Sequence, residues 1–342
     1  MEITLVHRDS LSCEPAVRRM PNGDLLILSM CEGLKEPELA NKAFLFRSSD
    51  NGKTFKNLGN MLPGDRRGVT TPEICVVDDK VLVFLGMHTG KQTDLENKLL
   101  VSEDSGFTFK DMGAFEPLPN FASIRGMIRK RNGDLMFCYQ YFPITPEENL
   151  RLNQNDCYIF EADIDYIEAG VLVSKDNGKT FEKYPANRQH IDKSIPKSHY
   201  RRWNWPEPSI VELEDEHIVM LMRRNNTGYL YRCDSYDGGK TFGEAFKTDI
   251  PNPGNRFQLL KLSDGRIVLI NTPNNVYSYE TRYPLEIWIS DDNMNSWYIK
   301  DRVSDFPGLY AYPNGFEDKE NKELIFTFEF NRHDIYLVRY KL

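Results

Sequence analysis

One eight-residue pattern recurs along this chain and constrains its fold more than any other feature. It reads Ser-x-Asp-x-Gly-x-Thr-Phe, and four copies occupy residues 48–55, 102–109, 174–181 and 235–242. A fifth copy, at residues 290–297, keeps Ser290, Asp292 and Trp297 but has Met294 in place of the glycine. The aspartates of successive copies are 54, 72, 61 and 55 residues apart, a period typical of one propeller blade per repeat.

The residue types of this pattern suit a tight turn between two strands. An aspartate carboxylate accepts hydrogen bonds from nearby backbone amides, and glycine adopts a positive φ at which other side chains clash. The threonine and the aromatic residue then begin the next strand, where the ring packs between blades. We therefore interpret the pattern as structural rather than as part of a binding site.

Between these turns the chain repeats a layout of short apolar strands. The dipeptides Asn22-Gly23, Asn132-Gly133 and Asp264-Gly265 are hairpin signals between paired apolar runs. The last unit, at residues 310–340, supplies only three strands, so we expect residues 3–7 to complete it and remove an open sheet edge. The prediction is all-β: a six-bladed β-propeller of four-stranded antiparallel blades, closed by the N-terminal strand, as a single domain over residues 1–342.

The composition excludes several classes of protein. The net charge is -8 and no basic stretch provides the positive surface of a nucleic-acid-binding protein. No apolar window reaches the length of about 18 residues that a membrane span needs, and the first ten residues lack the apolar core of a signal peptide. We therefore expect a cytoplasmic protein that has neither nucleic acid nor a membrane as its partner.

The six cysteines are scattered singly, with no CxxC pair and no metal-ligand spacing. We interpret them as buried free thiols of a reducing compartment. We expect no metal and no cofactor, and the sequence makes no prediction of the oligomeric state.

The repeated turn resembles the Asp box, or bacterial neuraminidase (BNR) repeat, of the sialidase superfamily, and the resemblance covers almost the whole chain. In that family the box joins the third and fourth strands of a blade on the face away from the active site. The resemblance therefore implies a sugar site at the opposite mouth of the central channel. The starts of the innermost strands and the loops between second and third strands meet at that mouth.

A segment in the fourth blade carries the most specific part of the resemblance. Trp203-Asn-Trp205-Pro-Glu207, followed by Arg223-Arg224, is similar to the sialidase segment in which a glutamate opens an inner strand and an arginine ends the next. Sialidases place a further arginine in the next blade and a tyrosine in the last, which implies Arg282 and Tyr310, with Tyr312 as the alternative. In that family the tyrosine is the nucleophile and the glutamate polarises it, an exception to the usual carboxylate nucleophile.

The other candidates follow from their positions in the repeat. In the long loop of the first blade, Glu32 is our choice for the acid/base carboxylate, although Glu36 and Glu38 lie in the same loop. His88 and His333 are further candidates for an acid or base near neutral pH. The predicted substrate-binding residues are Arg223, Arg282, Glu14, Glu73, Arg125, Arg332, His333 and Trp205.

One motif of the family is missing. A Tyr/Phe-Arg-Ile-Pro sequence should supply the first of three arginines around the substrate carboxylate, but this chain has Ser12-Cys13-Glu14-Pro15 there. Neither cysteine nor glutamate reproduces the two-point contact of a guanidinium with a carboxylate.

Three functions therefore stay open, each with an oligosaccharide or glycoside as partner. The first is a sialidase-like glycoside hydrolase that acts on a terminal, acidic sugar. The second is a propeller rhamnosidase or a uronate-cleaving polysaccharide lyase, which would use His88 or His333 in place of a tyrosine. The third is a non-catalytic glycan-binding propeller, because the fold alone does not imply catalysis.

Overall fold

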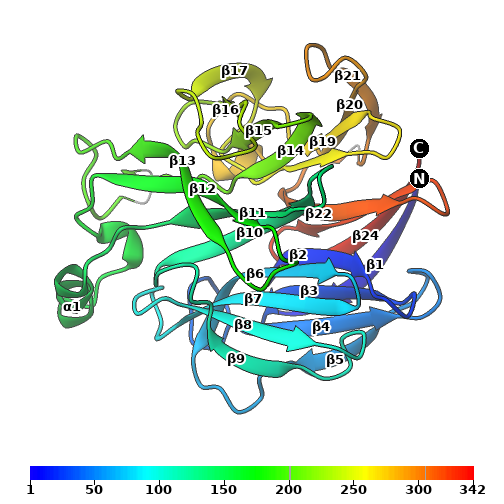
Figure 1. Cartoon of the computed structure of the whole chain (residues 1–342). Coiled ribbons are helices and arrows are strands. Elements are labelled where there is room, and N and C mark those ends of the chain that lie inside the picture. The colour runs from blue at the N-terminus through cyan, green and yellow to red at the C-terminus, as the bar shows by residue number, and fades with distance from the viewer. Residues whose placement is uncertain (200–201, 305) are drawn as a thin grey trace.

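Six four-stranded antiparallel sheets make up the computed structural model, which describes residues 1–199, 202–304 and 306–342. They are arranged as the blades of a propeller (Figure 1). The short helices α1 (Pro146–Gln154), η1 (Ile159–Glu161) and η3 (Tyr279–Thr281) lie in loops between strands. Within the described residues, no helix is long and apolar enough to cross a membrane.

Blades 1 to 5 each consist of four consecutive strands, ordered from the channel outward. Blade 1 contains β2 (Ser12–Arg19), β3 (Leu25–Cys31), β4 (Lys42–Ser48) and β5 (Lys56–Asn60). Blade 2 contains β6 (Gly68–Val77), β7 (Lys80–His88), β8 (Glu96–Ser102) and β9 (Lys110–Ala114). Blade 3 contains β10 (Ala122–Arg129), β11 (Leu135–Tyr141), β12 (Tyr166–Ser174) and β13 (Glu182–His190). Blade 4 contains β14 (Ser209–Glu214), β15 (His217–Met222), β16 (Tyr229–Ser235) and β17 (Phe246–Pro251). Blade 5 contains β18 (Gln258–Lys261), β19 (Ile267–Asn271), β20 (Glu286–Ser290) and β21 (Tyr298–Arg302).

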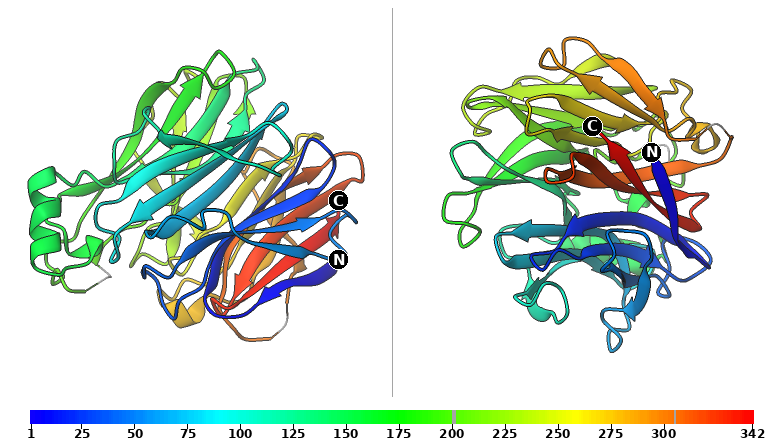
Figure 2. Two further views of the ribbon diagram at one scale, coloured as in Figure 1. Left: turned by 90° about the horizontal axis from the view of Figure 1, so that it is seen from below. Right: turned by 90° about the vertical axis from the view of Figure 1, so that its right-hand side faces the viewer.

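The sixth blade joins the two ends of the chain. It contains β22 (Tyr310–Asp318), β23 (Glu323–Phe330), β24 (Asp334–Lys341) and, as its outer strand, β1 (Glu2–Arg8). β1 pairs antiparallel with β24, and Arg8 Nη2 forms an ion pair of 2.6 Å with Asp334. Figure 2 shows the two termini beside each other on this blade. The prediction of a six-bladed propeller closed by the N-terminal strand is confirmed.

The repeated turns join the third and fourth strands of blades 1 to 5, as predicted. In the turn of blade 3, the Asp176 carboxylate accepts hydrogen bonds from Thr180 N at 2.8 Å and from Thr180 Oγ1 at 2.6 Å. Ser174 Oγ accepts a hydrogen bond from Gly178 N at 2.8 Å. The aspartate therefore fixes both ends of the turn by side-chain bonds.

The glycine of the turn has a second role that the sequence did not indicate. A Cβ on Gly52 would lie 2.5 Å from Leu337 of blade 6, and a Cβ on Gly106 would lie 2.7 Å from Leu26 of blade 1. These two turns therefore approach the preceding blade so closely that a side chain would displace them, in addition to requiring φ of +84° and +78°.

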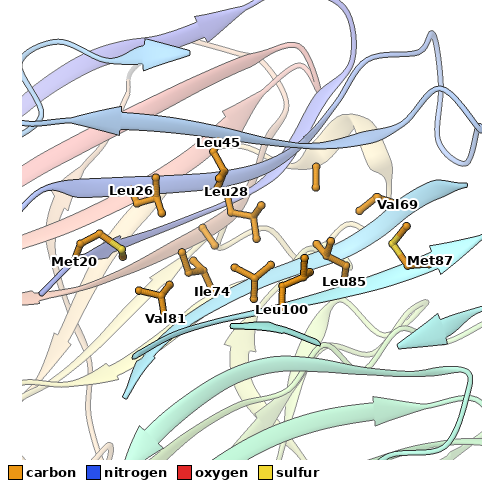
Figure 3. Packing of buried hydrophobic residues seen from close by; sticks show 13 residues of the cluster. Met20, Leu26, Leu28, Leu45, Val69, Ile74, Val81, Leu85, Met87 and Leu100 are labelled. Carbon is orange, nitrogen blue, oxygen red and sulfur yellow. The ribbon is translucent and has the colours of Figure 1, made fainter. Parts of the chain in front are cut away.

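The hydrophobic core lies between blades. Figure 3 shows the cluster between blades 1 and 2, where Leu26 and Leu28 of β3 face Ile74 of β6 and Leu85 of β7. Because adjacent sheets bury their apolar faces against each other, the core leaves the central channel to polar side chains. This arrangement positions the site described next.

Candidate functional site

Four blades have a strained residue in, or just before, their innermost strand. Glu14, Thr71, Glu207 and Tyr312 have φ of 52°, 49°, 38° and 53°, and a proline follows each of them. A positive φ is unfavourable for a residue with a side chain. β-Bulges interrupt the strand pairing at Glu14, Thr71 and Tyr312, and bulges redirect side chains. Strain of this kind concentrates at functional sites.

Four blades bring together a group of buried polar side chains that we call the mouth cluster: Glu14, Arg125, Glu207, Arg223 and Tyr312. Tyr312 Oη donates a hydrogen bond to Glu207 Oε1 at 3.0 Å, and Arg223 Nη1 donates to Glu207 Oε2 at 2.7 Å. Arg125 bridges two carboxylates, Glu207 at 3.2 Å and Glu14 at 3.0 Å. Glu207 is therefore the centre of the cluster.

The cluster fixes the protonation states of its acid and its phenol. Burial disfavours an ionised Glu207, but attraction to Arg223, Arg125 and Arg256 outweighs burial and lowers the pKa of this carboxyl to about 2. Burial and the negative charge of Glu207 raise the pKa of Tyr312 well above its ordinary value. At neutral pH Glu207 is therefore an ionised acceptor and Tyr312 a neutral donor.

The two candidate tyrosines lie in different surroundings. Tyr310 packs in the apolar core of blades 5 and 6, with its ring centroid 5.0 Å from that of Phe330. Its hydroxyl donates to the Phe306 carbonyl at 3.1 Å. Only Tyr312 of these two is brought to Glu207.

The three acidic candidates in the loop between β3 and β4 also differ in position. Glu32 is exposed, and Glu38 accepts a hydrogen bond from the backbone of its own loop. Glu36 instead faces the mouth, where it accepts a hydrogen bond from Thr70 Oγ1 at 3.2 Å and forms an ion pair with Arg332. The structure therefore brings Glu36, and not our sequence-based choice Glu32, toward the cluster.

Arg332 reaches the mouth from the tight turn between β23 and β24. Its Nη2 lies 3.1 Å from Cys13 Sγ, and its Nη1 lies 3.8 Å from Glu329 Oε1. Cys13 occupies the position at which the family motif has arginine. A guanidinium from the last blade therefore lies beside this position of the first blade.

Glu329 belongs to the site, although sequence reasoning missed it. It is fully buried, its Oε2 accepts a hydrogen bond from Glu14 N at 2.8 Å, and burial raises the pKa of its carboxyl to about 7 despite the nearby Arg332. The sequence did contain a signal for Glu329, because this carboxylate stands within the apolar run of β23.

Glu73 lies deeper in the channel than the mouth cluster. It follows the strained Thr71 by two residues and forms ion pairs of 3.1 Å with Arg18 and with Arg256. Asn314 also donates to it at 3.2 Å. Glu73 is therefore part of a buried polar layer that fills the channel below the mouth.

The predicted histidines lie outside the cluster. His88 is fully buried, and burial lowers the pKa of its imidazole to about 4, so the ring is neutral at pH 7. His333 is half exposed, with its Nδ1 2.6 Å from Asp334 Oδ1.

The last two candidates, Trp205 and Arg282, lie in different surroundings. Trp205 packs on Phe142 and Trp203, beside the segment that leads into Glu207. Arg282 is buried, and its Nη2 donates to the Gly254 carbonyl at 2.9 Å.

A cavity of about 530 Å³, which we call the rim cavity, opens between blades 1 and 6. Leu11, Leu34 and Glu36 line it from blade 1, and Arg332 and His333 line it from blade 6. Over residues 1–199, 202–304 and 306–342, no group of three or more His, Cys, Asp and Glu side chains is arranged to hold a metal ion.

The fold and its repeated turns define a propeller of the sialidase superfamily. The family model described as BNR repeat-like domain matches residues 62–322, and the chain belongs to that family. The prediction from the Asp-box resemblance is therefore confirmed. The comparison with curated proteins gave no match.

Several solved structures share the fold. The Hadza microbial sialidase Hz136 superposes with a TM-score of 0.72 at 17% identity, over 97% of this chain and 66% of its own. A Dyadobacter fermentans protein of unknown function has a TM-score of 0.71 at 16% identity, over 100% and 98% of the two chains. Trypanosoma rangeli sialidase, solved with 2,3-difluorosialic acid as a covalent intermediate, has a TM-score of 0.68 at 13% identity, over 98% and 54%. The chain thus spans about two thirds and about half of the two sialidases, and identities this low show the fold alone.

Proposed function

We propose that this protein is a glycoside hydrolase that removes a terminal, acidic sugar at the mouth, with Tyr312 as the nucleophile and Glu207 as the base that activates it. The observation that carries the proposal is the 3.0 Å hydrogen bond from Tyr312 Oη to Glu207 Oε1. Arg223 and Arg125 hold this carboxylate in place from two sides. A nucleophile within hydrogen-bond reach of a base that a third group orients is the arrangement nucleophilic catalysis needs.

The proposed reaction has two steps. Tyr312 Oη forms a bond to the anomeric carbon while the bond from that carbon to the leaving oxygen breaks. The phenol proton passes to Glu207, and Glu36, once protonated and released from its ion pair with Arg332, donates a proton to the leaving oxygen. Water then attacks the anomeric carbon, gives its proton to Glu36 and releases Tyr312, which recovers its proton from Glu207.

The neutral state of Tyr312 suits an anionic sugar. A carboxylate nucleophile would repel a negatively charged substrate, whereas a neutral phenol approaches it without that cost. Burial and the nearby carboxylates keep the phenol protonated until the base removes its proton.

Three guanidinium groups support an acidic substrate. Arg223 and Arg282 come from blades 4 and 5, and Arg332 lies at the place where the family arginine is missing. Arg223 Nη2 donates no hydrogen bond within the described part of the chain, so it has a donor to offer an incoming carboxylate. Burial raises the pKa of Glu14, which reduces the repulsion that this side chain would exert on an anion.

A neutral terminal sugar, as in a rhamnosidase, is the second candidate. The observation that favours it is that each of these guanidinium groups already has an acceptor inside the protein. Glu207 accepts from Arg223, the Gly254 carbonyl from Arg282, and Glu36 from Arg332. A rhamnosidase that uses His88 as its acid or base has less support, because the His88 side chain is fully buried.

The test compares two matched variants on a panel of 4-methylumbelliferyl glycosides: a sialoside, a glucuronide, a rhamnoside and a galactoside. Tyr312→Phe should lower kcat at least roughly a hundredfold, since it removes the attacking oxygen. Tyr310→Phe should keep the parent's kcat, because that ring lies in the core.

Hydrolysis of the acidic glycosides alone supports the first proposal, and hydrolysis of the neutral ones alone supports the second. A Tyr312→Phe variant as active as the parent would refute the first proposal and leave the second, which does not need a tyrosine nucleophile. A parent that binds these sugars without cleaving any would leave the glycan-binding alternative.

A further inference from the structure

The rim cavity has the size and the lining of a small-molecule site. Its volume of about 530 Å³ falls in the range of cavities that bind small organic groups. Leu11 and Leu34 provide apolar walls, and the turn between β23 and β24 closes the opposite side.

Three of the charged groups of the lining and Asn331 are engaged within the protein, whereas Ser10 and Lys35 also line the cavity. Glu36 and Arg332 pair with each other, and His333 Nδ1 lies 2.6 Å from Asp334. Asn331 Oδ1 accepts a hydrogen bond from Leu309 N at 2.9 Å. The surface that remains for a ligand is therefore that of the two leucines together with Ser10 and Lys35.

Leu34 is held in place although its side chain is 93% exposed. Its backbone N donates to Glu38 Oε2 at 3.0 Å. The buried Asn41 donates to the carbonyls of Glu32 at 2.8 Å and Lys35 at 3.1 Å on either side of it. The wall is therefore preorganised, and a ligand would remove nearly the whole Leu34 side chain from water without first ordering the loop.

The cavity shares Glu36 and Arg332 with the mouth, where Arg332 Nη2 lies 3.1 Å from Cys13 Sγ, next to Glu14 in the chain. Glu36 lines it, and the charge of Glu36 contributes to the raised pKa of Tyr312 and of Glu14, so this carboxylate lies within electrostatic range of both. A leaving oxygen that takes a proton from Glu36 has to lie beside it, and the group attached to that oxygen then extends into the cavity.

From these shared residues, and resting on the proposed function, we infer that the rim cavity is the leaving-group subsite and that it accepts an aglycone with an apolar or aromatic group, which packs on Leu34. Leu34 is then a specificity-determining residue for the leaving group.

The experiment compares Leu34→Ser with Leu39→Ser, a matched control in the same loop. Leu39 is half exposed and lies outside the cavity lining. For the sugar that the parent hydrolyses, kcat/KM is measured on the 4-methylumbelliferyl glycoside and on the methyl glycoside. Leu34→Ser should lower the value for the aryl glycoside roughly tenfold, the usual effect of losing one apolar contact group, and change the methyl glycoside less than about twofold. Leu39→Ser should change neither.

A second measurement does not depend on hydrolysis. In saturation-transfer NMR, free 4-methylumbelliferone should receive signal from the parent and from Leu39→Ser but not from Leu34→Ser. This pattern in a protein that cleaves no glycoside would support the subsite and refute the proposed hydrolase. Equal signals from all three proteins would overturn the inference and leave the hydrolase proposal standing. So would a Leu34→Ser variant whose kcat/KM falls equally on the aryl and the methyl glycoside.

Discussion

Replacing Arg125 by methionine should be among the most destabilising single changes in the channel. The side chain is 0% exposed and joins Glu14 at 3.0 Å to Glu207 at 3.2 Å. Methionine nearly fills the volume but leaves both carboxylates without this partner. Removing one member of a buried ion pair costs about 3–5 kcal/mol.

Glu14 should account for most of this cost. Glu207 keeps Arg223 and Tyr312, whereas Arg125 is the one ion-pair partner of Glu14 within the described residues. Adding Glu14→Gln to Arg125→Met should therefore restore part of the lost stability. Lowering the pH from 7 to 5 should also reduce the loss, because Glu14 has a raised pKa and takes up a proton readily.

The assay is urea unfolding followed by tryptophan fluorescence for the parent, both single variants and the double variant, at pH 7 and pH 5. An Arg125→Met cost below about 1 kcal/mol would refute the reasoning, since it falls far short of the cost of a buried unpaired charge. So would a double variant that is less stable than Arg125→Met alone.

Three further predictions concern Glu329, β1 and the repeated turns. The folded-state pKa of Glu329 is raised to about 7, so ionising this carboxyl costs stability increasingly as the pH rises from its ordinary pKa of 4.5 to 7. Glu329→Gln should therefore raise the melting temperature at pH 8 and hardly at all at pH 4; an equal gain at both would contradict this. Deleting residues 1–8 should lower the melting temperature sharply because β24 becomes an open edge, and an unchanged melting curve would disprove the closure. Asp176→Ala should lower the melting temperature and leave glycoside kinetics unchanged, because among the described residues its carboxylate bonds only within its own turn; lost activity in a folded variant would show otherwise.

The architecture could be predicted because it depends on local chemistry that repeats. The residues of each Ser-x-Asp turn form hydrogen bonds within that turn, so the turn is visible in the sequence. The last unit lacks a fourth strand, so the N-terminal strand was the one expected to complete it. The close packing of Gly52 against Leu337 was not predictable, because it depends on how two blades approach each other in space.

The site was harder to predict because it depends on breaks in regular structure. Tyr310 and Tyr312 are two residues apart and would share one face of a regular strand. The bulge between Ala311 and Asn314 and the positive φ of Tyr312 send them to different environments. Glu36 was not distinguishable from Glu32, because buried Asn41 and other contacts within the loop decide its conformation.

The most direct test of the account is to trap the proposed covalent intermediate. The parent would be incubated with the fluorinated analogue of the sugar that it hydrolyses, 2,3-difluorosialic acid in the case of a sialoside, and then digested and examined by mass spectrometry. The account predicts one adduct, on Tyr312, which is absent from Tyr312→Phe and present in Tyr310→Phe. An adduct on any other residue, or an unlabelled Tyr312 in a parent that the analogue inactivates, would contradict it.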